Sequence, residues 1–389
     1  MKKLFFIKKR FSIHGGAENY MKTLVNQLKN NYEITVLATH WEPADGVNFK
    51  YISSSRMTSF LSLITFGRNV CKAVRSNVPD CVISFERTPC QDIYRAGEGC
   101  HAEWLGIRSE VEPFYKHISF KINPSHLSLL SMERRLFSET PCIIANSNMV
   151  KANIIKHYHV PEEKIHLLYN GVDLVRFAPE NKEKWRNLVR DDLALRNETK
   201  LVLFVGSGFR RKGLQVLLEA ASLIRDNEIH VLVIGKGPVH KFKTMAARHG
   251  IADRILFMGP QRDIEKYYAA ADLFVLPTLY DPFSNATLEA MSSGLPVITT
   301  KNNGAAELIE NGKEGFTVNN MLDAKELAQY IIAALGDGHR MGAAARKKAA
   351  EFSIEKTAGA FAEIIDHVIV SKNRIGEHQN RRNGESEKR

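Results

Sequence analysis

The chain of 389 residues is long enough for two domains, and its 44% hydrophobic and 25% charged residues are typical of a folded globular protein. No apolar run approaches the ~18 residues of a membrane-spanning helix, and the apolar part of the start, "MKKLFFIKKRF", is too short for an export signal. The five cysteines show neither a C-x-x-C pair nor zinc spacing. Their odd number, without an export signal, predicts reduced thiols in a cytoplasmic protein.

The net charge of +11 is distributed unevenly. Residues 1–170 contain 22 Lys and Arg against 15 Asp and Glu, residues 171–370 contain 26 against 25, and residues 371–389 contain 6 against 3. The excess of positive charge in the first half predicts that this half binds an anionic acceptor or an anionic membrane surface. Ordinary solubility is the alternative explanation.

Short apolar runs alternate with helical patterns along most of the chain. In the first half the predicted strands are Lys3–Ile7, Glu33–Thr39, Cys81–Phe85, Cys142–Asn146 and Ile165–Tyr169. In the second half they are Leu201–Gly206, His230–Gly235, Ile255–Gly259, Leu273–Pro277, Pro296–Thr299 and Gly315–Val318. Helical patterns between them include Ala17–Asn30, Leu214–Asp226, His240–His249 and Ala324–Leu335. This alternation predicts parallel sheets covered by helices on both faces.

The alternation is interrupted once, at the charged stretch Val172–Thr199. We therefore expect an α/β protein of two doubly wound, Rossmann-like domains, residues 1–170 and 171–370, that face a central cleft at the carboxyl ends of their strands. Closing helices at about Met341–Phe352 and Ile354–Lys372 are expected to return to the first domain. Residues 371–389 are basic and polar, which predicts a disordered tail.

A glycine-rich turn, "GSGFRRKG", follows the strand predicted at Leu201–Gly206. Gly206 and Gly208 allow close backbone approach, and Arg211 and Lys212 come just before the next helix. Two cations at the carboxyl end of a strand are suited to clamping a diphosphate. The alternative is a loop with solvated charges.

A second segment, "DPFSNATLEAMSSGLP", places two acids around a helix start. Ser284 or Asn285 is a natural N-cap, which leaves the first backbone N–H groups of the helix as donors for an anion or a polar oxygen. Asp281 precedes this start, and Glu289 lies more than a turn inside the helix. The segment suits a ligand with phosphates and hydroxyl groups. The alternative is a capped amphipathic helix with two solvated acids.

Several other chemistries are not supported by the sequence. Neither "GSGFRRKG" nor "GKGPVH" supplies the glycines of a dinucleotide fingerprint, and no Walker motif, metal-spaced His/Cys cluster or Asp-x-Asp pair is present. Near the start, "FSIHGGAENYM" places Gly15 and Gly16 in a loop that opens a helix, where a phosphate or a sugar could lie.

Taken together, "GSGFRRKG", "FMGPQRDIEKYYAAADLFVLPT", "DPFSNATLEAMSSGLPVITT" and "GGAEN" resemble the retaining GT-B glycosyltransferases of family 4. The segments "ANSNMVKANI" and "HLLYNGVDLVRFAP" resemble the end of that family's first domain, so the resemblance covers nearly all of residues 1–370. "GSGFRRKG" and "FERTPCQDIYRAGEGCHAEW" are most similar to the lipopolysaccharide core glucosyltransferase I group.

The resemblance implies a role for each matching residue. Arg211 and Lys212 would hold the diphosphate, Glu289 the ribose hydroxyls, and Glu98 would be the acceptor-side carboxylate. The residues implied to surround the donor sugar and phosphate are Asp281, Phe283, Ser284, Asn285 and Ala286, with Gly206 and Arg262 also on the donor side. Gly15, Gly16 and Glu18 would close the site from the first domain.

The implied activity is retaining, metal-independent transfer of a hexose, glucose in that group, from a UDP-linked donor to a lipid-linked or lipopolysaccharide-core sugar. No cofactor is expected, because two cations and a helix N-terminus stabilise the leaving diphosphate. The family usually has Glu where Asp281 stands, which leaves the donor sugar open. Glu98 and His101 are candidates for a base, with an ordinary histidine as the alternative for His101.

Two segments, Arg56–Ser76 and His101–Phe137, mix apolar and basic residues at helical spacing. This composition predicts loose contact with the inner face of the cytoplasmic membrane, and core helices with a solvated basic face are the alternative. Other functions considered are a GT-B sugar-nucleotide epimerase, an inactive scaffold and a basic nucleic-acid-binding protein. No aromatic–basic interleaving of an RNA-binding module is present, so we expect no nucleic-acid partner.

Overall fold

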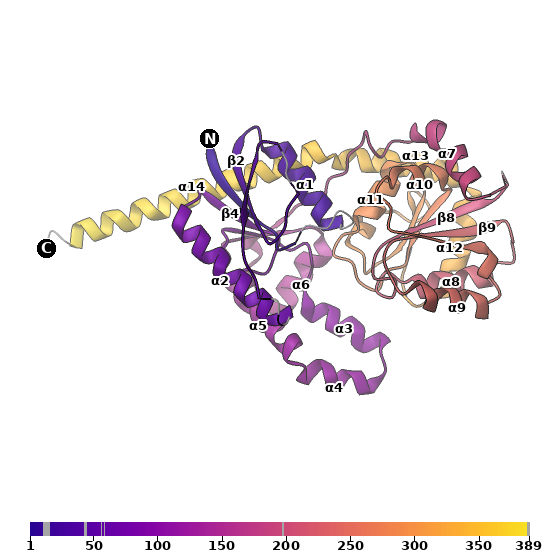
Figure 1. Ribbon diagram of the computed structural model, residues 1–389, viewed down its shortest axis with the longest axis horizontal. Coiled ribbons are helices and arrows are strands. Elements are labelled where there is room, and N and C mark those ends of the chain that lie inside the picture. The colour runs from indigo at the N-terminus through magenta and orange to yellow at the C-terminus, as the bar shows by residue number, and fades with distance from the viewer. Residues whose placement is uncertain (11–15, 43–44, 56, 58, 197, 387–389) are drawn as a thin grey trace. The chain divides into compact units, whose positions relative to one another are not determined.

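The computed structural model describes the chain except residues 11–15, 43–44, 56, 58, 197 and 387–389 (Figure 1). Contacts within the chain divide it into two compact units. The first unit contains Met1–Asn146, Val150–Leu168 and Glu355–Arg389, and the second contains Ser147–Met149 and Tyr169–Ile354.

The first unit is built on a seven-stranded parallel sheet with the strand order β3-β2-β1-β4-β5-β6-β7. The strands are β1 (Lys2–Ile7), β2 (Tyr32–Ala38), β3 (Val47–Tyr51), β4 (Cys81–Ser84), β5 (Ile93–Arg95), β6 (Cys142–Ala145) and β7 (Ile165–Leu167). Leu4, Phe6 and Ile7 are fully buried, because helices cover both faces of a parallel sheet and every side chain of a central strand enters the core. The strand order reverses direction between β1 and β4, which makes this pair the switch point of the sheet.

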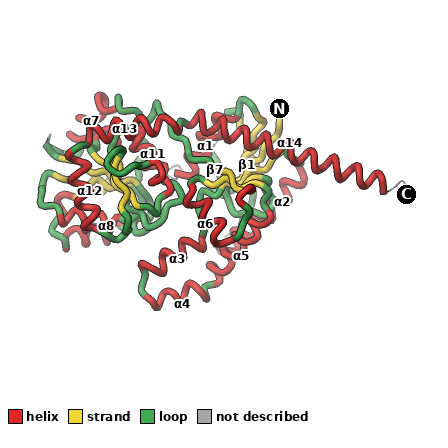
Figure 2. The backbone as a smooth tube through the Cα atoms, turned by 180° about the vertical axis from the view of Figure 1, so that it is seen from behind, coloured by secondary structure: helices red, strands yellow, loops and turns green. Residues whose placement is uncertain are grey.

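The helices of the first unit fall into two groups. Those that accompany the sheet are α1 (Gly16–Leu28), α2 (Ser59–Asn77), α6 (Asn148–Tyr158), the short helix η1 (Glu162–Lys164) and α14 (Ile354–Ser386). Between β5 and β6 the chain forms α3 (His101–Val111), α4 (Phe114–Ile122) and α5 (Pro124–Glu139). In Figures 1 and 2, α3 and α4 project away from the sheet of this unit.

Of the two closing helices predicted, α14 packs on the first unit, whereas residues 341–352 belong to the second unit, so the prediction that they return to the first domain is wrong. Phe361 and Ile365 are fully buried, Asp366 accepts a hydrogen bond from the Tyr32 hydroxyl at 2.9 Å, and Lys372 pairs with Asp92 at 3.0 Å. Where the sequence predicted an irregular tail beyond residue 370, the helix continues to Ser386. Adding residues to an existing helix avoids the cost of nucleation, so even a polar segment that contains Asn and Gly can prolong it.

The second unit has a six-stranded parallel sheet with the order β10-β9-β8-β11-β12-β13. Its strands are β8 (Lys200–Val205), β9 (Ile229–Ile234), β10 (Ile255–Gly259), β11 (Leu273–Leu276), β12 (Val297–Thr300) and β13 (Gly315–Val318). The switch point lies between β8 and β11, where Leu273 is paired with Val202. Both sheets are thus parallel and doubly wound, which confirms the predicted fold class.

Helices surround the second sheet (Figure 1). They are α7 (Asn181–Asp192), α8 (Leu214–Leu223), α9 (Val239–Arg248), η2 (Ala252–Arg254), α10 (Glu265–Ala270), α11 (Asn285–Ser292), η3 (Gly304–Leu308), α12 (Ala324–Gly336), α13 (Gly338–Ala349) and η4 (Ala350–Phe352). The charged stretch after Val172 contains α7. Its Arg190 is buried and donates hydrogen bonds to the carbonyl oxygens of Arg196 and Thr199 at 3.0 and 2.5 Å. These hydrogen bonds allow a charged side chain to lie in the interior.

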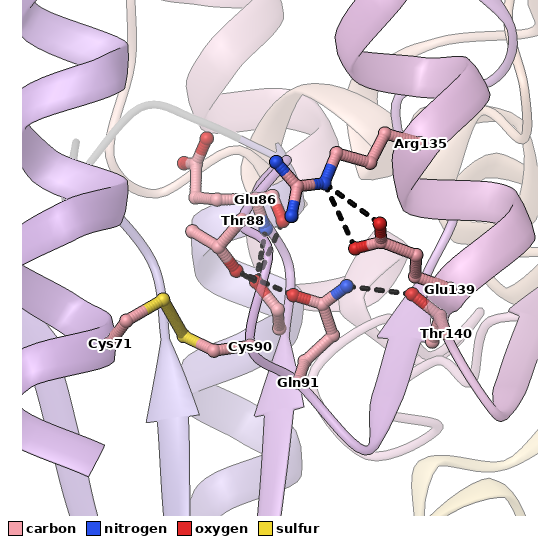
Figure 3. The surroundings of a disulfide bond; sticks show 9 residues. Cys71, Glu86, Thr88, Cys90, Gln91, Arg135, Glu139 and Thr140 are labelled. Atoms are coloured by element: carbon pink, nitrogen blue, oxygen red, sulfur yellow. Dashed lines mark hydrogen bonds and ion pairs between the residues drawn. A yellow bond between two sulfur atoms is a disulfide. The ribbon is translucent and has the colours of Figure 1, made fainter. Parts of the chain in front are cut away.

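The prediction that all five cysteines are reduced thiols is wrong for one pair. A disulfide joins Cys71 of α2 to Cys90, which lies between β4 and β5 (Figure 3). The two Cα atoms are 5.6 Å apart, within the range that a disulfide spans. Cys81, Cys100 and Cys142 are buried free thiols. No helix in the described part of the chain is long and apolar enough to cross a bilayer.

Candidate active site

Two of the sequence-predicted segments meet at the switch point of the second sheet. The turn after β8 carries Arg211 and Lys212, and the segment after β11 carries Asp281 and the start of α11. The backbone carbonyl of Arg211 accepts hydrogen bonds from the Leu279 amide at 2.8 Å and from the Thr278 hydroxyl at 3.0 Å. The neighbouring order of β8 and β11 therefore brings together residues that are about 70 positions apart in sequence.

Glycines allow the turn to pass this closely. Gly213 has φ +77°, and a Cβ atom there would overlap the backbone carbonyl of Pro277. A Cβ on Gly206 would lie only 3.1 Å from Cγ of Lys212, so the absence of a side chain leaves room for the lysine stem. Both positions thus serve the placement of the two cations.

The two cations are held in different ways. The Arg211 guanidinium donates to the carbonyl oxygen of Tyr280 at 2.9 Å, and the Lys212 ammonium forms an ion pair with the Asp281 carboxylate. The Lys212 and Asp281 side chains are only 13% and 9% exposed. Burial lowers the pKa of Lys212, the adjacent Asp281 carboxylate opposes this, and Arg211 adds to the lowering. A buried ammonium needs an anionic partner, and Asp281 supplies it.

Helix α11 starts beside this ion pair. Ser284 is the N-cap, and its hydroxyl accepts from the Thr287 amide at 3.3 Å. Asn303 stabilises the start because its side-chain oxygen accepts from the Ser284 amide at 3.1 Å. Its side-chain nitrogen donates to the Thr287 and Thr299 hydroxyls at 3.2 and 2.9 Å. The helix start predicted from the sequence is thus present, with Ser284 rather than Asn285 as the cap.

Glu289 lies one turn into α11 and is partly buried. The Tyr268 hydroxyl donates to its carboxylate at 2.9 Å. Burial raises the pKa of Glu289, although the hydrogen bond from Tyr268 and the charge of Arg176 oppose this shift. A carboxylate that is desolvated in this way gains from ligand hydroxyl groups that donate to it, and a ribose carries such groups.

The remaining predicted donor-side residues occupy varied positions in the second unit. The Asn285 side-chain oxygen accepts from Asn170 at 2.5 Å, and the Ala286 carbonyl accepts from the Tyr268 hydroxyl at 3.2 Å. Phe283 is buried, and its ring centroid lies 5.9 Å from that of Tyr169, so it is part of the interior. Arg262 is exposed in the loop after β10. Its backbone carbonyl accepts a hydrogen bond from Arg176, and the positive charge of Arg176 opposes the rise in the pKa of Glu289.

A second charged cluster lies at the switch point of the first sheet and includes Glu98. Arg87 forms ion pairs with Glu98 and with the fully buried Glu133, the latter at 2.8 Å. Lys8, which follows β1, lies 3.0 Å from Glu86 and 3.7 Å from Glu98. The Glu98 side chain is 42% exposed while its cationic partners are nearly buried, so Glu98 is the most exposed residue of the cluster.

The electrostatics of this cluster keep Glu98 ionised. Burial raises the pKa of Glu98, but the charges of Arg87 and Lys8 outweigh it and lower the pKa below its usual value. Glu18, in the first turn of α1, is among the acids that raise the pKa of Lys8 against the effect of burial. Of the two glycines predicted nearby, Gly16 begins α1 and Gly15 lies outside the described residues.

His101 is poorly suited to act as a base. Burial, together with Arg87 and His126, lowers the pKa of His101 to about 4, so the imidazole is neutral at pH 7 and binds a proton weakly. Its backbone amide donates to the buried Glu133 carboxylate at 2.9 Å, and its ring nitrogen lies 3.0 Å from that of His126. These contacts fit a structural histidine.

The sequence analysis missed several residues that hold these clusters. In the second unit they are Tyr268 and Asn303, and in the first unit they are Lys8, Arg87 and Glu133. The signal for Asn303 was "KNNGAAEL" directly after a predicted strand, because asparagine before glycine at a strand end often caps the next turn. Arg87 and Glu133 are 46 positions apart, and no local pattern links them.

Comparisons with known proteins bear on both units. Residues 14–176 match the family model described as Glycosyltransferase Family 4, and residues 186–351 match the model described as Glycosyl transferases group 1. The chain belongs to the glycosyltransferases. This family and the two parallel sheets confirm the resemblance seen in the sequence.

Individual relatives agree with the family assignment. The lipopolysaccharide glucosyltransferase WaaG of Escherichia coli is 24% identical over 85% of this chain and 88% of its own length. A D-inositol 3-phosphate glycosyltransferase of Streptomyces scabiei is 30% identical over 57% of this chain and 53% of its own.

Solved structures show the same fold. The crystal structure of WaaG superposes with a TM-score of 0.82 at 22% identity, covering 93% of this chain and 99% of that one. Anabaena HepE in complex with UDP-glucose superposes with a TM-score of 0.73 at 19% identity, covering 94% and 100%. This glycosyltransferase therefore has the GT-B fold.

Substitution of either clamp cation tests the site. We expect Arg211→Ala and Lys212→Ala each to lower kcat by 100-fold or more, because loss of one charge contact to the transition state costs about 3 kcal/mol. Steady-state transfer with a nucleotide sugar measures the effect. Arg210→Ala, an exposed cation of the same turn, is the matched control and is expected to change kcat less than about 3-fold. Near-normal turnover of the Arg211 or Lys212 variant would show that the site is misplaced.

The two acids around α11 are expected to have separable roles. Glu289→Gln removes a charged acceptor of ribose hydroxyls, so nucleoside diphosphate affinity is expected to fall by about 1.5–3 kcal/mol per lost bond. Asp281→Asn is expected to leave that affinity nearly unchanged and to lower turnover or alter sugar preference. Calorimetric titration of UDP into both variants measures the difference, and the reverse pattern of affinities would contradict the assignment.

Stability provides the control for Glu289→Gln. A carboxyl whose pKa is raised in the folded state stabilises the fold only below that pKa and loses this contribution as pH rises through it. At pH 8 the variant is therefore expected to unfold at no lower denaturant concentration than the unmodified protein. A loss of affinity then reports on ligand contacts rather than on unfolding.

Proposed function

We propose that this glycosyltransferase moves a hexose, glucose by its similarity to WaaG, from a UDP-linked donor to a lipid-linked or lipopolysaccharide-core sugar. The observation that carries the proposal is the group formed by Arg211, Lys212, Asp281 and the start of α11 at the switch point of the second sheet. In α/β sheets such switch points are where nucleotides bind. The UDP-glucose complex of the structurally similar HepE supports a nucleotide-sugar donor.

The donor's diphosphate is proposed to bind between the two cations and the first amides of α11. The leaving nucleoside diphosphate gains negative charge as the glycosidic bond breaks, and fixed positive groups stabilise that charge most in the transition state. Lys212 is already held in place by Asp281, so little reorganisation is needed when the donor binds. Two cations and a helix N-terminus supply the charge that Mg²⁺ supplies in other transferases, so we propose metal-independent transfer without a cofactor.

Asp281 and Glu289 are proposed to contact different parts of the donor. Asp281 lies beside Lys212, and the carboxylate oxygen that does not contact Lys212 is proposed to accept a hydrogen bond from a sugar hydroxyl. Glu289 lies a turn further along α11 and is proposed to accept hydrogen bonds from the ribose.

Glu98 is proposed to position the acceptor. Its lowered pKa makes it a weak proton acceptor but a strong hydrogen-bond acceptor. A carboxylate fixed by Arg87 and Lys8 can orient an acceptor hydroxyl for attack on the sugar. We propose that proton transfer involves the donor phosphate, with retention of anomeric configuration, because neither Glu98 nor His101 is tuned as a base near pH 7.

A membrane location is proposed for the tip formed by α3 and α4. Four apolar side chains on α4 are strongly exposed: Phe114 (76%), Tyr115 (69%), Ile118 (55%) and Ile122 (68%). Their spacing places them along one side of a two-turn helix, beside the exposed Lys121. An apolar face with a nearby cation on a projecting element suits insertion into the interface of an anionic bilayer, where a lipid-linked acceptor would be present. We propose that the protein acts at the cytoplasmic face of that membrane.

A donor panel tests the proposed reaction. Hydrolysis or transfer is expected with UDP-glucose at a higher kcat/KM than with GDP- or ADP-sugars, and activity is expected to survive excess EDTA because the charge stabilisation comes from protein groups. Proton NMR of the product is expected to show the anomeric configuration of the donor.

Complete loss of activity on chelation, restored by Mg²⁺ or Mn²⁺, would contradict the metal-independent mechanism. An inverted product would contradict retention, and epimerisation without an acceptor would favour the epimerase alternative.

The membrane proposal is tested with vesicles. The triple variant Phe114→Ser/Ile118→Ser/Ile122→Ser is expected to bind phosphatidylglycerol vesicles at least about 10-fold more weakly in a sedimentation assay. The serine side chains bury much less apolar area in the bilayer interface than the residues they replace. The matched control is Val175→Ser/Leu188→Ser/Ile332→Ser, which truncates exposed apolar residues of the second unit. Equal binding of both variants, or equal binding of the unmodified protein to neutral phosphatidylcholine vesicles, would contradict the proposal.

A further inference from the structure

The disulfide of the first unit lies within reach of solvent. Cys71 and Cys90 are both partly exposed, and they connect α2 to the loop between β4 and β5 (Figure 3). Reaction of a disulfide with an external thiol requires access to one of its sulfur atoms. This bond therefore differs from Cys81, Cys100 and Cys142, whose thiols are buried and whose pKa values are raised by burial.

A basic cavity opens beside Cys71. It has a volume of about 370 Å³ and is lined by Arg68, Cys71, Lys72, Arg75, Ser76 and Pro89. Arg68, Lys72 and Arg75 are exposed and follow one another at helical spacing on α2, so their side chains share one face of the helix. Within the described ranges none of the three forms an ion pair, and Glu86, in the loop that bears Cys90, is paired with Lys8. The cavity thus carries positive charge next to a disulfide sulfur.

This juxtaposition has a specific chemical consequence. A thiolate attacks a disulfide sulfur, and nearby cations both attract an anionic thiol and stabilise the thiolate that attacks or leaves. We propose that the cavity is a binding site for small anionic thiols, of the class of carboxylate-bearing thiol peptides, and that Cys71–Cys90 exchanges with them there. The inference does not depend on the proposed transferase reaction.

The exchange proceeds in two steps. In the first, the thiolate of the small thiol forms a bond to Sγ of Cys71, the Cys71–Cys90 bond breaks, and Cys90 leaves as a thiolate that takes a proton from water. In the second, another molecule of the thiol attacks the mixed disulfide and releases Cys71 as a thiol. In total, two thiols are oxidised to one small disulfide, and the protein disulfide is reduced to two thiols.

The loop that carries Cys90 links this site to the charged cluster around Glu98. Thr88 donates to Gln91 at 2.8 Å and Gln91 donates to Thr140 at 2.7 Å, which ties the loop to the end of α5 (Figure 3). Arg87, three positions before Cys90, is the partner of Glu98. Opening the disulfide removes a covalent constraint from the loop that positions Arg87, so the redox state is expected to alter the mobility of residues 86–91.

The cations are tested by comparing two thiols on the oxidised, full-length protein. Reduction is followed by alkylation of released thiols and mass spectrometry, with glutathione as the anionic thiol and 2-mercaptoethanol as the neutral one. For Arg68→Gln/Lys72→Gln/Arg75→Gln, the rate constant with glutathione is expected to fall about 10-fold or more at low ionic strength, as electrostatic steering predicts. With 2-mercaptoethanol the change is expected to be less than about 2-fold, since no charge is recognised.

Matched variants decide the outcome. Lys3→Gln/Lys121→Gln/Arg134→Gln removes the same charge from exposed positions of the first unit that do not line the cavity, and is expected to retain the glutathione rate within about 2-fold. Cys90→Ser is expected to form a mixed disulfide with oxidised glutathione at Cys71 faster than Cys71→Ser forms one at Cys90, because Cys71 lines the cavity.

Three results would overturn the proposal. They are equal slowing with both thiols, equal slowing in both triple variants, and a protein in which Cys71 and Cys90 remain unbonded after equilibration with oxidised glutathione. Hydrogen exchange of the amides of residues 86–91 is expected to become faster on reduction, whereas unchanged exchange would show that the bond places no constraint on the loop.

Discussion

The second unit is organised around a buried cation that must be neutralised. The Lys212 ammonium is nearly removed from solvent, and Asp281 is the anion that compensates it. Bringing these two residues together requires β8 and β11 to be neighbours, a Gly206 without a side chain and a Gly213 in the left-handed region. Removing one partner of such a pair would leave a buried charge uncompensated, at a cost of about 3–5 kcal/mol. The site geometry and the local fold are therefore parts of the same constraint.

The first unit also pairs buried cations with carboxylates at the switch point of its sheet. The loops after β1, β4 and β5 contribute Lys8, Arg87 and Glu98, and Glu133 is added from α5. The two clusters differ in what they leave accessible. In the second unit the cations are associated with a helix N-terminus, which suits an anionic ligand, while in the first unit the most exposed member of the cluster is an acid, Glu98, which suits hydroxyl groups. This difference is consistent with a donor site in the second unit and an acceptor site in the first.

The sequence predicted the parts of the molecule that depend on local pattern. Alternating apolar runs located most strands of both sheets but not β3 and β5 of the first sheet. The segment around Ser284 located a capped helix with acids on either side of its start. Helix α7 was missed because its surface is charged and its interior residue is an arginine satisfied by backbone carbonyls. The Cys71–Cys90 bond, the role of Asn303 and the Arg87–Glu133 pair depend on which loops meet in space, and no local pattern carries that information.

Both proposed roles of the second unit require a nucleoside diphosphate to bind at the switch point of its sheet. Hydrogen–deuterium exchange of the protein with and without UDP, GDP and ADP measures this binding. The nucleotide that binds is expected to slow exchange in the 206–213 turn and at the first amides of α11. Protection confined to the first unit, with the turn after β8 and the start of α11 unchanged, would contradict it.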